Sequence, residues 1–369
     1  MSLSNFDVFK IRSSLLLLWL AASCSPDAVP PVAENRGIIA GTSAANNPGV
    51  FVVGTDWEGS SVNIAKVWNQ GKAVSLTDGT QTANATSVFI SGSDIYVAGW
   101  ENSAVERPFG STGQAKYWKN GVPVFLEGSP NDPNPMVANS IYVSGTDVYV
   151  AGTLGTGPNS YAAYWKNNVV RKLTFTAQEV NATSIYVSDS DVYVAGYVGY
   201  PREKLIAKLW KNGNELSLSD STENASALSV FVSGSDVYVA GYVGTTNSIA
   251  TYWKNGKAIN LTDGSKWAQA RSIFVSGSDV FVAGFNGQQA LYWKNGVAVP
   301  LTDGTTGYCF ANSIMVSGTD VYVTGNESVN KAKLWKNGVA IDVSNSGNVD
   351  ATFANSIFVV PQGLMQTIH

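Results

Sequence analysis

The sequence has 369 residues, of which 14% are charged and 11% are aromatic, and its formal net charge is −4. A soluble domain usually carries about 25% charged residues, and here glycine and small polar residues take their place, which favours turns and short strands. The aromatic content argues against disorder, the lack of a basic run argues against nucleic acid as a partner, and the only histidine, His369, excludes histidine triads and histidine metal clusters.

Residues 1–23 are predicted to be a signal peptide. Lys10 and Arg12 precede a short apolar run that ends in small residues at Cys24, which is the order of a secretory signal. The run is too short to cross a bilayer permanently. The segment Leu20-Ala21-Ala22-Ser23-Cys24 resembles the lipobox of bacterial lipoproteins, although Ala stands three residues before the Cys, where that motif usually has Leu.

This resemblance implies that Cys24 is acylated on its sulfur and on its new amino group, so that lipid anchors the mature chain to a membrane. Ser25, in place of Asp, then implies sorting to the outer membrane of the bacterial cell envelope. The alternative is an ordinary secretory signal with an incidental cysteine. Residues 24–48, which are rich in proline, are predicted to be a flexible tether attached to the lipid. With Cys24 in lipid, the other cysteine, Cys309, has no disulfide partner and is predicted to be a small buried residue.

The remainder of the chain repeats one motif, "YWKNG" or a close variant, every 40 to 50 residues. Such a period suits four short strands per repeat. One repeat reads as strands at 140–143, at 148–151, around Trp165 and at 169–175, and no segment shows helical periodicity. The repeats centre on the tryptophans Trp68, Trp118, Trp165, Trp210, Trp253, Trp293 and Trp335.

Two kinds of turn separate the strands of each repeat. Asn-Gly pairs such as Asn120-Gly121 supply the positive φ angles of a tight hairpin between the third and fourth strands. Ser-Gly-Ser-Asp segments such as 233–236 suit a turn between the first and second strands. These first two strands are almost continuously apolar, as expected where neighbouring sheets cover both of their faces.

The two ends of the repeat region complement each other. The first repeat starts at its second strand, 50–54, and the final strand, 356–359, has no strand after it. Pairing these strands would complete one sheet and remove its open edges. The sequence therefore predicts an all-β fold, a seven-bladed β-propeller over 49–360 with four strands per blade, followed by a tail at 361–369. A solenoid of the same sheets is the alternative, but it would not need this complementary pair.

This organisation resembles bacterial envelope lipoproteins built from "VSGSDVYVAG…YWKNG" repeats, and the resemblance covers about 310 of the 369 residues. It implies the propeller fold and the envelope location. It implies no activity, because function lies in sites added to a fold and we associate no chemistry with the repeat itself.

Loop length distinguishes the two faces of the predicted ring. One face carries the loops between the second and third strands together with the crossovers between repeats. We call it the variable face, because the loops between the second and third strands vary in length from 5 to 15 residues. Variable loops on a rigid scaffold are usual places for binding. Aromatic rings and polar donors there suit sugars or peptides. The candidate ligand-binding residues are Trp100, Tyr197, Tyr242 and Phe285 after the second strand, and Asn139, Arg271 and Asn312 where the first strand begins near the ring centre.

Several repeated residues have simpler structural explanations. The aromatic candidates could merely pack under their own loops, and the repeated tryptophans are predicted to pack between blades. The lysines that follow them, such as Lys254, are predicted to be solvated, and the aspartates before the second strands, such as Asp236, are predicted to cap turn amides. We find no carboxylate pair of the glycosidase kind, no calcium loop and no sialidase motif, and therefore predict no catalytic site, no metal and no cofactor.

The sequence thus favours a monomeric, non-enzymatic, membrane-anchored binding propeller that recognises a glycan or a protein through the variable face. One alternative is a scaffold for an envelope assembly complex. Another is a polysaccharide-acting enzyme with carboxylates dispersed over different blades, such as Glu101, Glu106 and Glu203.

Overall fold

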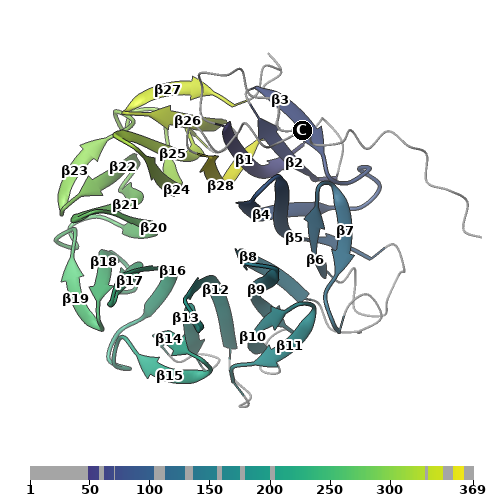
Figure 1. Cartoon of the computed structure of the whole chain (residues 1–369). Coiled ribbons are helices and arrows are strands. Elements are labelled where there is room, and N and C mark those ends of the chain that lie inside the picture. Colours follow the sequence, from purple (N-terminus) through teal and green to yellow (C-terminus); the bar gives the residue numbers. More distant parts are fainter. Residues whose placement is uncertain are drawn as a thin grey trace, which may run out of the picture. The chain divides into compact units, whose positions relative to one another are not determined.

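The computed structural model describes residues 49–57, 62–69, 71–103, 113–128, 136–155, 160–174, 179–199, 204–328, 331–343 and 352–360. The predicted signal peptide, the predicted lipidation site Cys24, the predicted tether and the C-terminal tail lie outside these residues. The described residues form 28 strands in seven four-stranded antiparallel sheets arranged in a ring, which is a seven-bladed β-propeller (Figure 1). The predicted fold is therefore confirmed.

Each blade uses its four strands in order from the ring centre to the rim (Figure 1). The innermost strands are β28 (Phe353–Val360), β4 (Ala83–Ser91), β8 (Met136–Ser144), β12 (Glu179–Ser188), β16 (Ala225–Ser233), β20 (Ala268–Ser276) and β24 (Phe310–Ser317). The second strands are β1 (Gly49–Asp56), β5 (Asp94–Asn102), β9 (Asp147–Leu154), β13 (Asp191–Gly199), β17 (Asp236–Val243), β21 (Asp279–Asn286) and β25 (Asp320–Asn326). The third strands are β2 (Ile64–Asn69), β6 (Gly113–Lys119), β10 (Tyr161–Lys166), β14 (Ile206–Lys211), β18 (Ile249–Lys254), β22 (Gln289–Lys294) and β26 (Ala332–Lys336). The outermost strands are β3 (Lys72–Ser75), β7 (Val122–Phe125), β11 (Val169–Lys172), β15 (Asn214–Ser217), β19 (Lys257–Asn260), β23 (Val297–Pro300) and β27 (Val339–Asp342).

The first blade is shared between the two ends of the repeat region, as predicted. β28 pairs antiparallel with β1, and Ile357 lies opposite Val52. The order β28-β1-β2-β3 gives this blade the same four strands as the others. The last innermost strand therefore closes the ring and covers the edge of β1 that would otherwise be open.

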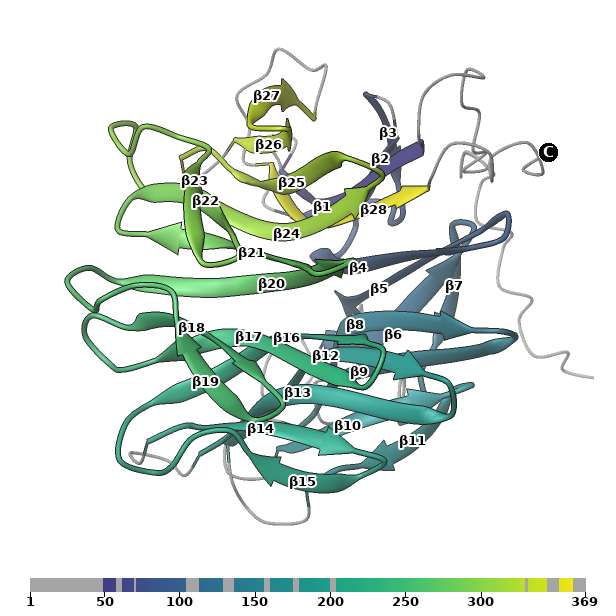
Figure 2. The ribbon, with the colours of Figure 1, turned by 60° about the vertical axis from the view of Figure 1, so that its left-hand side comes forward.

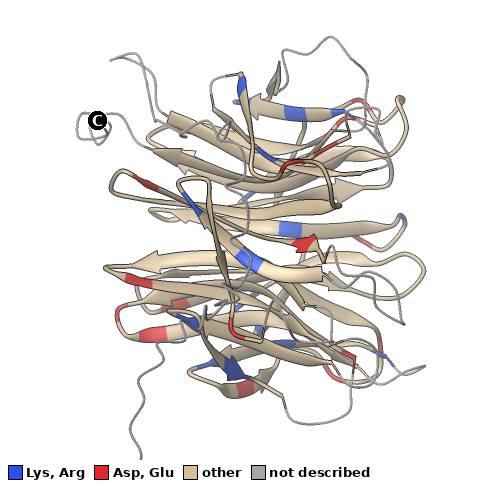
Figure 3. Ribbon diagram, turned by 90° about the vertical axis from the view of Figure 1, so that its right-hand side faces the viewer, with Lys and Arg blue, Asp and Glu red and all other residues tan. Residues whose placement is uncertain are grey.

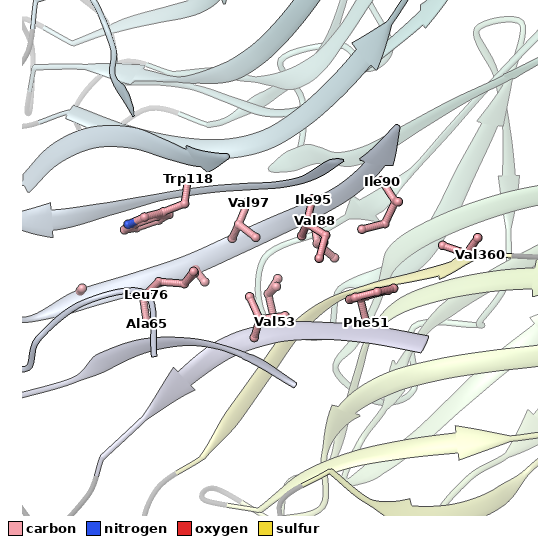
Figure 4. Close-up of a cluster of buried hydrophobic side chains, with 13 residues drawn as sticks. Phe51, Val53, Ala65, Leu76, Val88, Ile90, Ile95, Val97, Trp118 and Val360 are labelled. Atoms are coloured by element: carbon pink, nitrogen blue, oxygen red, sulfur yellow. The ribbon is translucent and has the colours of Figure 1, made fainter. Parts of the chain in front are cut away.

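The core consists of apolar layers between neighbouring blades, which stand side by side around the ring (Figure 2). In the layer shown in Figure 4, Phe51 and Val53 of β1 face Val88, Val97 and Trp118 of the next blade. Each of the seven repeated tryptophans is no more than 2% exposed, which confirms that they pack between blades. Because this packing recurs at every interface, the sheets form one continuous ring of hydrophobic contacts.

A charged clamp joins the two hairpins of a blade on the face opposite the variable face. Asp236 accepts a hydrogen bond from Nδ2 of Asn255 at 2.8 Å and forms an ion pair with Lys254 at 2.7 Å. Oδ1 of Asn255 accepts from the backbone N–H of Val237 at 2.8 Å, and Nζ of Lys254 lies 5.2 Å from the ring centroid of Tyr238. The corresponding ion pair is present in six blades.

The clamp corrects two sequence predictions. The lysines are ion-paired rather than simply solvated, because the third strand ends beside the aspartate that starts the second strand. The asparagine of the Asn-Gly turn, rather than the aspartate, binds the backbone amide. Basic and acidic residues are consequently interspersed on the side of the ring shown in Figure 3.

Candidate functional site

A ring of β-bulges surrounds the centre of the variable face. In every blade the register between the innermost and second strands shifts by one residue just before the repeated serine. The second strand has glycine at this level, and a Cβ on Gly241 would lie 1.9 Å from the backbone oxygen of Ser226, so no larger residue fits beside the bulge. The bulged residues are Thr86, Asn139, Thr183, Leu228, Arg271, Asn312 and Asn355.

Five of the bulged residues act as latches between neighbouring blades. Asn139, for example, donates from Nδ2 to the backbone oxygen of Ala182 at 2.8 Å and to Oδ1 of Asn181 at 2.7 Å. These bonds satisfy buried backbone carbonyls across the blade interface. The other four latches, which bind the equivalent alanine carbonyls of the next blade, are Thr86, Thr183, Asn312 and Asn355.

Two adjacent blades depart from this pattern. Leu228 has no side-chain donor, and Arg271 donates from Nη1 to Oδ1 of Asn312 at 2.7 Å instead. A pocket of about 550 Å³ lies at this side of the ring centre. Because it is lined by the first residues of innermost strands and the end of β25, it opens on the variable face. We call it the central pocket, and it is lined by Leu228, Gln269, Arg271, Phe310, Asn312, Asn326, Phe353 and Asn355.

Arg271 is the one cation among the residues that line the central pocket. Its Cζ lies 4.5 Å from the ring centroid of Phe310 and 4.9 Å from that of Phe285. Cation–π contacts of this kind position a guanidinium without neutralising its charge. Burial lowers the pKa of Arg271 to about 10, so the side chain carries its full positive charge at neutral pH.

An aromatic cluster adjoins the guanidinium. The ring centroid of Trp267 lies 4.6 Å from that of Phe285 and 6.1 Å from that of Tyr308, and Tyr308 is stacked on Phe310 with an interplanar angle of 11°. Trp267 is 37% exposed and Tyr308 is 48% exposed. Both rings lie beside Phe310, which lines the central pocket, and both are partly open to solvent.

Trp267 and Tyr308 were not among the residues predicted from the sequence. Both lie in crossovers between blades, three residues before the alanine that precedes the bulge. Thr82 and Asn224 stand at this position in other blades. An alignment of the crossovers, in addition to the strands, would have shown that two adjacent repeats carry an aromatic residue there.

The structure brings Arg271 and Asn312 together in the central pocket, and the other predicted residues do not line it. Trp100, Tyr197 and Tyr242 are half-buried on second strands and do not line the pocket. Burial raises the pKa of the Tyr197 and Tyr242 hydroxyls. Asn139 serves as a latch.

Phe285 requires a correction, since it is fully buried with 0% exposure rather than exposed on the rim. The connection that follows β21 is short, and Trp267 and Phe310 contact the Phe285 ring with centroids 4.6 Å and 4.9 Å away. Phe285 therefore packs against the guanidinium of Arg271, and its ring is not accessible to a ligand.

The carboxylates considered for catalysis are not gathered at this site. Glu101 forms an ion pair with the buried Lys116 at 2.6 Å, and Glu106 and Glu203 lie outside the described residues. Within the described ranges, no group of three or more His, Cys, Asp or Glu side chains is placed to hold a metal.

The described part of the chain contains no helix that is long and apolar enough to cross a membrane. Cys309 is buried, as predicted.

Comparisons with known proteins identify no family. No family model matches the chain, and no curated protein matches it. A similar solved structure is the computationally designed Ika8 protein, with 12% identity, a TM-score of 0.40 and coverage of 81% of each chain. Another belongs to a structural and mechanistic analysis of two prolyl endopeptidases, with 12% identity, a TM-score of 0.46 and coverage of 85% of this chain but 50% of the other. At this identity and these scores, neither likeness bears on function.

Proposed function

We propose that the chain is a non-enzymatic binding propeller of the bacterial cell envelope, anchored to the outer membrane through Cys24, that recognises a glycan or a protein through its variable face. The observation that carries the recognition part is the central pocket beside exposed aromatic rings. Its volume of about 550 Å³ is within the range of small-ligand sites, which combine apolar walls with a few convergent polar groups. The anchor and the location rest on the sequence around Cys24 alone.

The departure from the repeat supports the choice of this site. Five bulged residues are latches that bind a backbone carbonyl of the next blade and so stabilise the ring. Leu228 has no donor for this bond, and Arg271, on the neighbouring blade, binds Asn312 instead. Both residues line the central pocket, and functional sites commonly depart from the local rules of their fold. The remaining aromatic candidates stay secondary, because the structure does not bring them into a common pocket.

Site-specific photo-crosslinking in intact cells tests recognition by the variable face. A photoreactive phenylalanine analogue at position 267 would capture a glycoconjugate or protein, whereas the same analogue at position 278 should not. Ser278 is a matched control, because it is exposed on the same blade but lies in the turn between β20 and β21 on the opposite face. Identical captured products at both positions, or none at position 267, would contradict the proposed function.

A further inference from the structure

The hydrogen bonds of the central pocket show which polar groups remain available to a ligand. Asn312 donates both of its amide hydrogens, to Oδ1 of Asn326 and to the backbone of Ala354. Asn326 donates to the backbone of Thr352, and Asn355 donates twice to the next blade. These three amides are therefore committed largely to holding the pocket wall.

The groups that remain available include the donors of Arg271 and Gln269. Arg271 has five N–H donors, and one of them binds Asn312. The side-chain amide of Gln269, a half-buried lining residue, has no hydrogen-bond partner among the described residues. A ligand that satisfies both side chains must therefore present acceptor oxygens.

The charge of Arg271 points in the same direction. Among the described residues, no carboxylate lies within ion-pair distance of its guanidinium, which instead contacts two aromatic rings and one amide. Placing a cation away from water without an anionic partner is costly. An oxyanion that bound Arg271 would offset this cost and would form charge-assisted hydrogen bonds, which are about twice as strong as neutral ones.

Aromatic rings line the central pocket at Phe310 and Phe353, and Trp267 and Tyr308 lie beside Phe310. Trp267, Tyr308 and Phe353 are each at least 36% exposed, and aromatic faces of this kind pack against the C–H faces of a ring. An anionic group with an attached ring would therefore use both parts of the site, whereas an inorganic anion would leave the aromatic faces in water.

We propose that the central pocket binds an acidic saccharide, with the carboxylate of a uronic acid residue on Arg271 and Gln269 and the rings of the saccharide against Phe353 and, at the edge of the pocket, Trp267. This inference rests on the proposed function and narrows its ligand class. The guanidinium and amide donors together match the two oxygens of a carboxylate. The volume of about 550 Å³ suits one or two sugar residues.

Calorimetric titration of the full chain in detergent provides the test. The probes are a disaccharide with one glucuronic acid residue, its neutral counterpart with glucose in that place, glucose 6-sulfate, and an N-acetylated tripeptide with a free C-terminus. The glucuronic acid disaccharide should bind at least about tenfold more tightly than the others. Its affinity should fall as salt is added and as the pH drops below about 4, where the carboxylate becomes protonated.

Variants distinguish the role of Arg271 from a general effect of charge. R271Q should weaken binding of the acidic disaccharide at least about tenfold and leave that of the neutral disaccharide unchanged. R271K should be intermediate, because lysine keeps the charge but loses the planar fork. The matched control is R171Q, which removes an exposed arginine on β11 and should have no effect. Gln269→Leu is a second variant should R271Q fail to fold, as judged by thermal unfolding, and it should also weaken acidic binding.

Equal affinity for the acidic and neutral disaccharides would overturn this inference, and so would an undiminished preference in R271Q. Tighter binding of the sulfated sugar or of the peptide would overturn the uronic acid assignment. Binding of none of the probes would overturn it as well. In each case the proposed function falls only if the photo-crosslinker at position 267 also captures nothing, or captures the same products as the control at position 278.

Discussion

The side-chain amide of Asn355 lies 2.8 Å from the backbone oxygen of Ala85 and joins two residues that are 270 positions apart in the chain. Asn355 belongs to β28, the strand that completes the first blade, and Ala85 belongs to β4 of the second blade. The latch therefore acts at the point where the two ends of the repeat region meet. It adds a directional bond to a closure that otherwise depends on strand pairing and apolar packing.

Replacing Asn355 by Leu, the residue that stands at position 228, should lower the free energy of unfolding by about 1–3 kcal/mol. The change removes two hydrogen bonds and leaves the carbonyl of Ala85, which is 0% exposed, without this donor. Urea unfolding measures the effect. The reverse change, Leu228→Asn, restores a latch and should be neutral or stabilising, so equal losses in both variants would show that the latch contributes nothing.

Truncation tests the closure of the ring. Ending the chain after Asp350 removes β28 and should cost more than about 4 kcal/mol, since burying each of Ile357, Val359 and Val360 stabilises by roughly 1.5–3 kcal/mol. Ending the chain after Val360 should leave the free energy of unfolding almost unchanged. Similar melting temperatures of the two truncated chains would be incompatible with a blade shared by both ends.

The charged clamps predict how stability depends on pH. Hydrogen bonds from Lys254 and then Asn255 hold the pKa of Asp236 below its ordinary value of 3.8, and the corresponding aspartates in five other blades are lowered in the same way. A pKa that is lower in the folded chain contributes stability that is present above pH 3.8 and is lost as the pH falls through the folded value. The urea midpoint should therefore decrease steeply below about pH 4.

Asp236→Asn should reduce the number of protons taken up on unfolding in acid by up to one, and so flatten the dependence of stability on pH. Lys254→Met should reduce it as well, because the carboxylate then loses the largest cause of its lowered pKa. A pH profile that neither variant alters would indicate that the clamp does not contribute to stability in acid.

The anchor is tested by Cys24→Ser. This variant should move from the membrane to the soluble envelope fraction, because lipid on Cys24 is the only attachment that the sequence predicts. Acyl labelling of the parent chain should disappear in the variant. Membrane association of the variant, together with an unlabelled parent chain, would show that Cys24 is not a lipidation site.

The fold could be predicted because each blade is encoded by the same local sequence pattern of strands and turns. Trp253 and its six counterparts fix the period, and the unmatched strand at 356–359 fixes the closure. The central pocket could be predicted only in part, because it forms where the residues of neighbouring blades differ from the repeat pattern. Arg271 and Asn312 were found at an aligned position, whereas Trp267 lies in a crossover whose pattern is weaker. Phe285 shares its position with Trp100 but is buried, because what covers a residue depends on its neighbours in space.

The two kinds of tryptophan should respond to substitution in opposite ways. Trp253 is 1% exposed and packs between blades, so Trp253→Ala should cost about 3–5 kcal/mol of stability through the cavity that it leaves. Trp267 is 37% exposed, so Trp267→Ala should cost much less stability. It should weaken ligand binding at least about tenfold, since removing an aromatic contact from a binding site often costs about 2 kcal/mol. Thermal unfolding and calorimetric titration with the best-binding probe measure the two effects. Tyr197→Ala, which alters an aromatic residue outside the central pocket, should leave that binding unchanged. A loss of stability in Trp267→Ala as large as that in Trp253→Ala, with affinity retained, would identify Trp267 as a core residue and place the binding site elsewhere.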